Sequence, residues 1–169
     1  MDYSDFKLGV DSHLIQLKSW EENRLVATLM AKQCRRHLDI ISRLLDPFIF
    51  NSPEFVDAVR QLVLSKRRPK IRIIVFDPQR IISNDHQLVS LAGDLSSFIE
   101  IRKASNEYKY YNECLMLADR IAYLNRIDSE RYEATANFND RKKCKYFDDE
   151  FIEMWESALP DPNMRRVNL

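Results

Sequence analysis

The sequence predicts an α/β fold with a mixed, partly parallel central sheet and helices on both faces of the sheet. Residues 71–76 have the sequence IRIIVF, a nearly continuous apolar run that ends at Asp77-Pro78. A strand that is apolar on both faces must be covered on both faces, which is typical of a central parallel strand. Apolar strand candidates also alternate with amphipathic helix candidates along most of the chain, as they do in α/β proteins.

Length and composition are those of one globular domain. The chain has 169 residues, of which 45% are hydrophobic and 31% are charged. A chain of this size can bury roughly two-thirds of the surface that it exposes when unfolded. We expect an N-terminal extension over residues 1–18, a single domain over residues 19–160 and a C-terminal tail over residues 161–169.

Composition disfavours several classes of protein. Lys plus Arg equals Asp plus Glu at 26 each, which argues against a protein that works mainly by coating polyanions. Gly9 and Gly93 are the only glycines, so a glycine-rich phosphate loop cannot be built. No signal peptide is visible, and no apolar segment approaches the ~20 residues that cross a bilayer. Cys34, Cys114 and Cys144 lack paired spacing, so we expect a reduced, cytoplasmic protein without membrane contact.

The first half of the chain carries three predicted elements before the central strand. Residues 19–22 fit a capping box that begins a helix, which continues to about residue 35. Residues 38–45 are predicted to form a first strand that ends at Asp46-Pro47. Residues 52–54, Ser-Pro-Glu, are a strong helix start, because proline suits the first helical position and an acid suits the first turn. A basic connector, residues 66–70, then leads into the central strand.

The second half of the chain is predicted to add two helices and four strands. We expect a helix over residues 85–95, strands over 98–102, 114–119, 121–124 and 131–138, and a last helix that Asp148 caps. The predicted order is therefore a helix followed by β-α-β-α-β, a pair of strand pieces around a short turn, one more strand and the last helix.

This order, with a strand pair after the third strand, resembles one half of the phospholipase D superfamily fold. Active members carry His-x-Lys-x4-Asp at the entry to the fourth strand. Placing Asp119 on the Asp of that motif puts Asn112 at the His position and Cys114 at the Lys position. Asn137 then falls near the place of a later Gly-Ser-x-Asn segment.

The chain from about Leu25 to Leu169 is also similar to a bacterial domain family of unknown function with a degenerate form of this fold. The segments that carry this similarity are residues 75–77, 85–88, 99–102, 151–155, 161–162 and 165–166.

The departures from the active superfamily remove its chemistry. In active members the His attacks phosphorus and the Lys stabilises charge on the phosphoryl oxygens. The amide of Asn112 has no usable nucleophilic lone pair, and Cys114 brings no positive charge. Asp119 alone would repel a phosphodiester. We therefore do not expect the superfamily's reaction, because most of the catalytic free energy is lost with these two groups.

A different site at the same crevice is one interpretation of the polar residues near strand ends. Asp77, His86, Arg102 and Asp119 are expected at or just beyond strand ends, where open α/β sheets bind ligands. His86 is expected near a helix N-terminus, which lowers the pKa of an imidazole. The candidate ligand-binding residues are Asp77, His86, Arg102, Asn112, Asp119 and Asn137. They fit a residual pocket for an anion or nucleotide, or an enzyme with a new site at Asp77, His86 and Arg102. The plainer interpretation is that the acids end strands and His86 caps a helix.

Three basic clusters favour another alternative, a nucleic-acid-binding accessory domain. They are residues 35–36, residues 141–145 and the connector that contains Lys66, Arg67, Arg68 and Lys70. Tyrosines at positions 108, 110 and 111 could add base stacking. All three clusters fall in predicted connectors and acids offset them across the chain, so solvated loops are the simpler explanation.

The leading interpretation is a non-catalytic phospholipase D-like binding or regulatory module. Its partner would be an unknown protein or an anionic ligand. The resemblance implies a homodimer, because active relatives pair two such halves around one cleft. The histidines are far apart and no Cys-His pairing exists, so we expect neither a metal site nor a cofactor.

Overall fold

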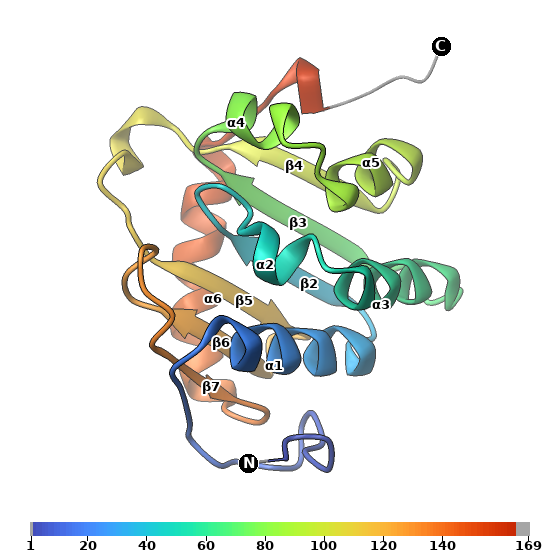
Figure 1. The fold of residues 1–169 in the computed structure, drawn as a ribbon, viewed down its shortest axis with the longest axis vertical. Coiled ribbons are helices and arrows are strands. Elements are labelled where there is room, and N and C mark those ends of the chain that lie inside the picture. Colours follow the sequence, from blue (N-terminus) through green and yellow to red (C-terminus); the bar gives the residue numbers. More distant parts are fainter. Residues whose placement is uncertain (1, 165–169) are drawn as a thin grey trace.

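The computed structural model describes residues 2–164, and its strands form one mixed sheet in the order β1-β7-β6-β5-β2-β3-β4-β8 (Figure 1). The strands are β1 (Ile15–Leu17), β2 (His37–Ile41), β3 (Lys70–Val75), β4 (Ile99–Lys103), β5 (Cys114–Ala118), β6 (Ala122–Arg126), β7 (Ala134–Asn137) and β8 (Leu159–Pro160). The helices are α1 (Trp20–Gln33), α2 (Pro47–Phe50), α3 (Pro53–Leu64), α4 (Pro78–Ser83), α5 (Gln87–Asp94) and α6 (Arg141–Ser157). Two 3₁₀ turns, η1 (Asn106–Tyr108) and η2 (Pro162–Met164), complete the described elements.

The centre of the sheet is the parallel trio β2, β3 and β4. His37 on β2 pairs in register with Lys70 on β3, and Ile71 on β3 pairs with Ile99 on β4. Four side chains of β3, at positions 71, 73, 74 and 75, are buried completely or nearly so. The predicted central parallel strand and the mixed α/β fold are therefore confirmed.

The other half of the sheet is antiparallel and includes a strand from the expected N-terminal extension. β5 pairs with β2, β6 with β5, and β7 with β6, all antiparallel. Ile15 and Leu17 of β1 pair with Ala136 and Ala134 of β7. Residues that precede residue 19 therefore contribute an edge strand to the domain. Residues 165–169 of the expected tail lie outside the described residues.

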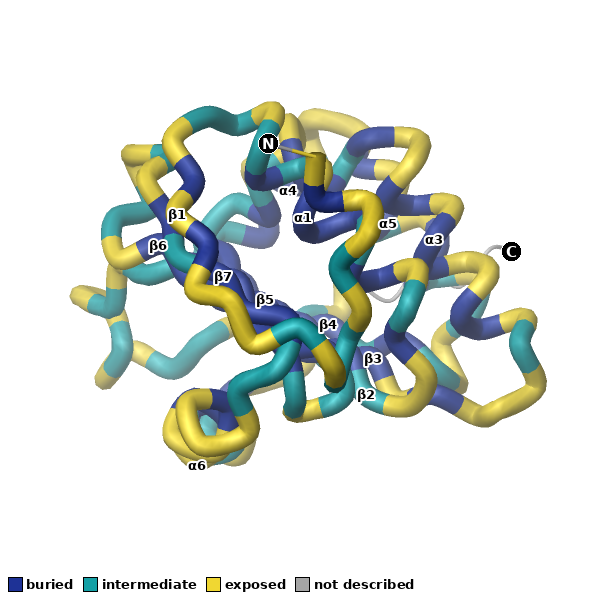
Figure 2. The backbone as a smooth tube through the Cα atoms, turned by 90° about the horizontal axis from the view of Figure 1, so that it is seen from below, coloured by how far each residue is buried: buried dark blue, intermediate teal, exposed yellow. Residues whose placement is uncertain are grey.

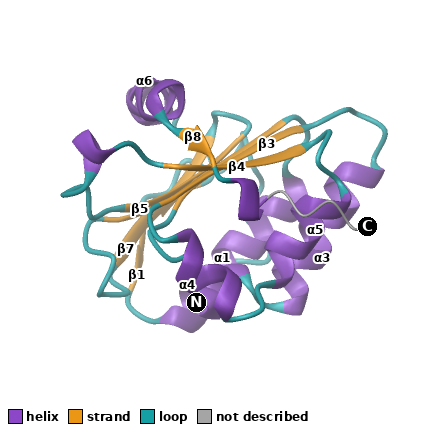
Figure 3. Cartoon of the chain, turned by 90° about the horizontal axis from the view of Figure 1, so that it is seen from above, coloured by secondary structure: helices purple, strands orange, loops and turns teal. Residues whose placement is uncertain are grey.

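Helices cover both faces of the sheet unequally. Helices α1, α3 and α5 lie on one face and α6 lies alone on the other (Figure 3). Two buried clusters match this division: a large one beneath α1, α3 and α5, and a smaller one between α6 and strands β2, β3, β5 and β6. Figure 2 shows the buried residues along the strands and on the sheet-facing sides of the helices.

Local sequence signals explain where α1 and α3 begin. The Ser19 hydroxyl accepts the backbone N–H of Glu22 at 3.2 Å, and the Glu22 carboxylate accepts the Ser19 hydroxyl and the Lys18 backbone N–H. Before α3, the Ser52 hydroxyl accepts the N–H of Phe55 at 3.2 Å, with Pro53 at the first helical position. Both predicted helix starts are confirmed.

The predicted start of the last helix is wrong. Helix α6 begins at Arg141, and its cap is Asp140, whose carboxylate accepts the N–H of Lys143 at 3.0 Å. Asp148 lies inside this helix, buried, 3.6 Å from the guanidinium of Arg120. The short helices α2 and α4 were not expected either; Asp46 and Asp77, which the sequence suggests as strand ends, cap them instead.

Charged side chains fill part of the layer under α6. Arg72 on β3 pairs with the fully buried Asp39 on β2 at 2.8 Å, and its guanidinium lies 4.9 Å from the ring centre of Phe151. Burial raises the pKa of Asp39, while the hydrogen bond and charge of Arg72 oppose that rise. The pair thus lets two strands carry charge inside a packed layer.

Replacing Phe151 by alanine should destabilise the domain strongly. The Phe151 side chain is completely buried, and its loss opens a cavity between α6 and the sheet. We expect urea unfolding to show a loss of about 3–5 kcal/mol. Tyr146→Ala on the exposed side of the same helix is the control and should cost much less. Similar losses for the two variants would contradict this packing.

Candidate functional site

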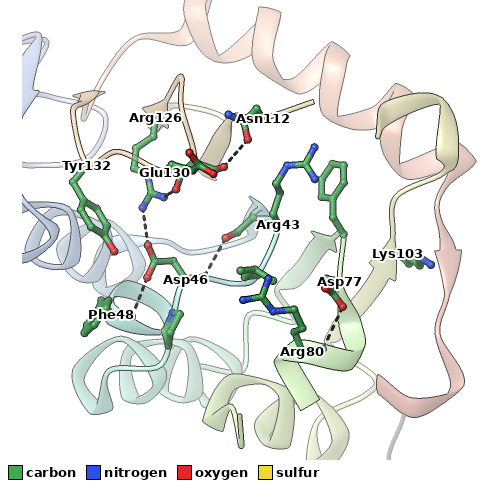
Figure 4. Close-up of a pocket in the computed structure, with 15 residues that line it drawn as sticks. Arg43, Asp46, Phe48, Asp77, Arg80, Lys103, Asn112, Arg126, Glu130 and Tyr132 are labelled. Atoms are coloured by element: carbon green, nitrogen blue, oxygen red, sulfur yellow. Dashed lines mark hydrogen bonds and ion pairs between the residues drawn. The ribbon is translucent and has the colours of Figure 1, made fainter. Parts of the chain in front are cut away.

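A cavity of about 850 Å³ opens at the edge of the sheet where β2 and β3 end, which we call the pocket edge (Figure 4). Its walls come from the connectors after β2 and β3, the segment before β5, the ends of β4 and β6, and the β6–β7 loop. The lining residues are Ser42, Arg43, Leu44, Asp46, Pro47, Phe48, Phe76, Asp77, Arg80, Lys103, Asn112, Arg126, Ser129, Glu130 and Tyr132. Ligand crevices in open α/β sheets are expected at this position, outside the carboxyl ends of parallel strands.

A buried ion pair forms one wall of the cavity. Nη1 of Arg126 lies 3.0 Å from Oδ2 of Asp46, and only 3% of the Arg126 side chain is exposed. Nη2 of Arg126 donates to the Ser129 carbonyl at 2.8 Å, and the guanidinium lies 4.8 Å from the ring centre of Tyr132. Burial, followed by the nearby Asp46 charge, raises the pKa of Tyr132 to about 12. The charge of Arg126 is thus neutralised by Asp46 and held rigidly in place.

Arg43 on the opposite wall holds a loop instead of facing solvent. Its Nη2 donates to the carbonyl oxygens of Lys109 and Tyr111, at 2.6 Å for Lys109. The guanidinium lies 4.4 Å from the ring centre of Phe76, which itself stacks on Tyr111. Arg43 therefore ties the loop between β4 and β5 to the end of β2.

Arg80 and Lys103 are the exposed cations of the cavity. Arg80 comes from α4, and Figure 4 shows its side chain directed into the opening. Asp77 accepts the backbone N–H of Arg80 at 3.3 Å and so is occupied as a helix cap. Glu130 is the exposed acid on the β6–β7 loop. The lining contains four basic and three acidic residues and carries a net charge of +1.

Asn112 and Cys114, which the resemblance places at the His and Lys positions of the phospholipase D motif, are both neutral groups. Asn112 lines the cavity, where its amide donates to Asp128 at 3.2 Å and accepts the Ser129 hydroxyl at 2.6 Å. Both ends of this amide are therefore used to anchor the β6–β7 loop. Cys114 is buried beneath the cavity, and burial raises the pKa of its thiol to about 11. The thiol is neutral near pH 7 and supplies neither charge nor a thiolate.

The two serine hydroxyls of the cavity are engaged in local hydrogen bonds. Ser42 Oγ accepts the backbone N–H of Asp46 at 3.1 Å, and Ser129 Oγ donates to Asn112. No histidine is among the lining residues. Activation of a serine nucleophile needs a general base within hydrogen-bond reach, and the described lining places no histidine beside Ser42 or Ser129.

His86 caps α5, as the sequence predicts, and lines a smaller cavity that adjoins the main one and shares Arg80 with it. One ring nitrogen, Nδ1, accepts the N–H of Leu88 at 3.2 Å, and Nε2 lies 2.7 Å from the carbonyl oxygen of Leu45. Because that carbonyl only accepts, we assign the ring proton to Nε2. The side chain is 4% exposed, and burial lowers the pKa of the imidazole. His86 therefore links α5 to the connector after β2 as a neutral ring.

The remaining candidate residues lie away from the cavity. Arg102 faces α6, with its guanidinium 4.1 Å from the ring centre of Trp155 and Nη1 donating to the Trp155 carbonyl. Asp119 lies at the opposite edge of the sheet, where it accepts the backbone N–H groups of residues 35, 36 and 37 at 2.9, 2.7 and 3.0 Å. Asn137 also lies at that edge and donates to the Ser12 carbonyl at 3.4 Å. The structure brings Asp77 and Asn112 to one cavity and separates the other four.

Of the nucleic-acid candidates, Lys66, Arg67 and Arg68 precede β3 and Lys70 is its first residue, so all four lie opposite the pocket edge. Within residues 2–164, no three His, Cys, Asp or Glu side chains are grouped to hold a metal ion. In the same range, no helix is both long and apolar enough to span a membrane.

Sequence reasoning missed the residues that shape the cavity. Arg126 and Asp46 are 80 residues apart in the chain, so no local pattern joins them. An arginine that directly continues the apolar segment 121–124 was the available signal, because such a residue needs a partner when buried. No local sequence pattern placed Arg43 or Arg80 in the cavity, because the position of each side chain depends on the path of the connector after its strand.

Fold and cavity together define a phospholipase D-like α/β domain, and solved structures share its fold. Nuc from Salmonella typhimurium, a phospholipase D family member, has a TM-score of 0.62 and 15% identity, covering 89% of this chain and 99% of Nuc. NucT from Helicobacter pylori has a TM-score of 0.60 and 15% identity, covering 88% of this chain and 99% of NucT. TrmBL2, an archaeal chromatin protein, has a TM-score of 0.65 and 13% identity over 90% of this chain. The chain spans about half of TrmBL2, 55% of its length.

The chain belongs to the family described as domain of unknown function DUF7931, whose model matches residues 19–167. No curated protein matches the sequence. The expected phospholipase D-like fold and the expected similarity to a family of unknown function are confirmed.

Removing the charge of Arg126 should destabilise the fold because the largely buried carboxylate of Asp46, 13% exposed, would lose its partner. Breaking a buried ion pair on one side costs about 3–5 kcal/mol, so we expect Arg126→Met to lower the unfolding free energy by this amount in urea. The control is Arg131→Met, whose side chain is 73% exposed and pairs with Asp128. If Arg126→Met lowered the unfolding free energy by less than Arg131→Met does, the ion pair with Asp46 would not stabilise this wall of the cavity.

His86 should make the fold less stable in mild acid. Its pKa is lowered in the folded state, so the unfolded chain binds the proton more readily below about pH 6.5. Stability that is complete above this pH is then lost as the pH falls toward the folded pKa. We expect His86→Asn, which can still cap α5, to lose less stability than the native chain between about pH 7 and pH 5. His13→Asn, at an exposed histidine, should follow the native profile. Parallel profiles for the native chain and His86→Asn would refute this role.

Proposed function

We propose that this domain is a non-catalytic phospholipase D-like binding or regulatory module that holds an anionic ligand at the pocket edge. The observation that carries the proposal is the pair of neutral groups at the motif positions. Asn112 is engaged on both sides with the β6–β7 loop, and Cys114 is a buried, neutral thiol. A fold that binds phosphorus compounds in its active relatives thus keeps the crevice without an attacking group.

The exposed cations supply the attraction for an anion. Arg126 and Asp46 cancel one another, and Arg43 is engaged with backbone carbonyls. Arg80 and Lys103 remain exposed at the mouth, with Glu130 as the exposed acid. A guanidinium and an ammonium can bind phosphate oxygens with charge-assisted hydrogen bonds.

The size and walls of the cavity suit a small molecule that carries an anionic group. Its volume of about 850 Å³ lies within the range typical of sites for small organic ligands. Phe48 and Tyr132 add aromatic surface on the side away from Lys103 (Figure 4). A phosphomonoester such as a nucleotide combines the two features, an anion for Arg80 and a planar group for the aromatic wall.

An enzyme with a new site at Asp77, His86 and Arg102 is less well supported by the geometry. Asp77 caps α4, the neutral ring of His86 is buried beside a smaller adjoining cavity, and Arg102 is under α6 on the other face of the sheet. General acid–base catalysis requires its groups within reach of one reacting atom. These three side chains share no cavity.

Nucleic acid is a second candidate partner, favoured by one comparison. TrmBL2, which shares this fold, is described as an archaeal chromatin protein with a novel mode of DNA binding. In this chain the basic connector 66–70 lies opposite the pocket edge, so a nucleic acid bound there would leave the cavity free. A homodimer also stays a prediction for this module.

The proposal predicts phosphate binding without turnover. Calorimetric titration of the full chain with inorganic phosphate and with AMP should show saturable binding of both, tighter for AMP. Arg80→Gln should weaken binding about tenfold, the loss of roughly one charge-assisted hydrogen bond. Arg60→Gln, on the exposed side of α3, is the matched control and should bind normally.

Incubation with bis(p-nitrophenyl) phosphate tests the non-catalytic part. We expect no release of nitrophenolate above the rate in buffer. Turnover that disappears in Asn112→Ala or Cys114→Ala would overturn the proposal, and so would equal phosphate affinity for Arg80→Gln and the native chain.

A further inference from the structure

We infer that the edge of the sheet opposite the pocket binds the phosphate backbone of duplex nucleic acid. We call it the basic edge and define it by ten exposed side chains from three sequence clusters and one hairpin turn. They are Arg35, Arg36, Lys66, Arg67, Arg68, Lys70, Arg120, Arg141, Lys142 and Lys143. The inference does not depend on what the cavity binds, because the two surfaces lie at opposite ends of β2 and β3.

The parallel pairing of β2 with β3 brings two of the clusters together. His37 and Lys70, the first residues of the two strands, are paired in register. The N–H of Lys70 donates to the carbonyl of Arg36 at 2.7 Å. Residues 35–36 and 66–70 are thus neighbours at the start of the parallel strands, as Figure 1 shows for the connectors that enter β2 and β3.

The β5–β6 turn brings the third cluster to the same edge. Ala118, the last residue of β5, pairs with Leu38 of β2, so Arg120 in the following turn lies beside the start of β2. The N–H of Asp140 donates to the carbonyl of Ile121 at 2.9 Å, which places the first turn of α6 against this turn. Arg141, Lys142 and Lys143 belong to that helical turn. These clusters are far apart in the sequence, and the fold brings them to one surface.

Acids interleaved with these cations are occupied by the protein itself. Both carboxylate oxygens of Asp119 accept backbone N–H groups. Asp140 caps α6, and Asp148 is buried beside Arg120 at 3.6 Å. Asp119 and Asp140 are therefore turned toward backbone N–H groups, Asp148 offsets Arg120 from beneath, and the other basic side chains are exposed. A chain with no net charge consequently carries a strongly positive edge.

The dimensions of the basic edge suit a duplex. From β6 through β5 and β2 to β3, the edge crosses three interstrand spacings, which is about 15 Å. Duplex DNA carries one charge per about 1.7 Å of axis, so this length presents roughly nine phosphates on its two strands. The cations are spread along the edge and not gathered around one point, as the backbone of a polyanion requires.

Side-chain chemistry favours duplex over single-stranded nucleic acid or a lipid surface. Single-strand binders stack bases on exposed aromatic rings, and within the described part of this edge Tyr146 is the exposed aromatic side chain near the clusters. Membrane-surface helices need a broad apolar face beside their basic residues, whereas α6 packs its apolar face on the sheet. Phosphate contacts without base contacts predict binding that is independent of sequence.

The test is fluorescence anisotropy with labelled duplexes of about 20 base pairs and unrelated sequences, at several salt concentrations. We expect all duplexes to bind with similar affinity. The triple variant Lys66→Asn, Arg67→Gln and Arg68→Asn should bind at least tenfold more weakly at about 50 mM salt, with the slope of log K against log salt reduced by about 2–3. Asparagine replaces Lys66 and Arg68 because both have positive φ, 65° and 52°, which asparagine tolerates.

A second triple variant guards against a local folding effect. Arg141→Gln, Lys142→Gln and Lys143→Gln lie on α6, far from residue 66 in the chain, and should weaken binding similarly. The control triple Lys18→Gln, Arg60→Gln and Arg131→Gln removes the same charge from exposed positions elsewhere and should bind normally. Circular dichroism should show all three variants folded.

Several results would overturn the inference. They are no duplex binding by the native chain at low salt, an equal loss in the control triple, tighter binding of a single strand than of duplex, or tighter binding to vesicles of anionic lipid. Arg80→Gln separates this inference from the proposed function, because that variant should lose phosphate affinity in the cavity and keep its affinity for duplex. Loss of duplex binding by Arg80→Gln would place the polyanion at the pocket edge and refute the basic edge.

Discussion

The parallel pairing of β2, β3 and β4 is the constraint on which both surfaces of this domain depend. Each crossover connection must return to the edge where the previous strand began. The carboxyl ends of the three strands (the exits) therefore lie at one edge of the sheet, and their amino ends (the entries) lie at the other. The exits carry Asp46, Asp77 and the cavity. The entries carry the basic connectors, which the register of His37 with Lys70 places side by side. One choice of strand direction therefore separates the cavity from the basic edge.

Two of the four basic side chains that line the cavity are engaged by the protein itself. Arg126 and Arg43 both line the cavity, but Arg126 is paired with Asp46 and Arg43 donates to two backbone carbonyls. An anion would have to compete with Asp46 for Arg126, and breaking that buried pair costs several kcal/mol. Arg80 has no such competitor in its own helix, since Asp77 faces the backbone N–H at the start of α4. Binding at the mouth is therefore favoured over binding at the floor.

Local pattern predicted the elements whose signals are complete within a few residues. The apolar run of β3 and the Ser52-Pro53 start of α3 are of this kind. The start of α6 was misplaced because its first turns are basic and half-exposed, which hides the apolar period, and because Asp148 imitates a cap. The Arg126–Asp46 pair and the convergence of the basic clusters could not be predicted, since both require the strand order. The same holds for Arg102, whose contact with Trp155 joins β4 to a helix 53 residues later.

The direction of the helices determines how many cations at the basic edge are used to stabilise helix ends. Helices α1, α3 and α5 cover one face and run toward this edge, so their negative ends lie there, and a cation in a last helical turn stabilises such an end by about 0.3–1 kcal/mol. Lys32 has that position in α1, whereas α3 and α5 have no basic residue in their last turns. The residues of the basic edge begin beyond those turns, where the dipole effect fades. Helix α6 begins at the same edge and adds a positive end to Arg141, Lys142 and Lys143 instead of compensating them. The fold thus concentrates cations at the entries of its parallel strands beyond what its helices use, and an external polyanion is the partner that would relieve their mutual repulsion.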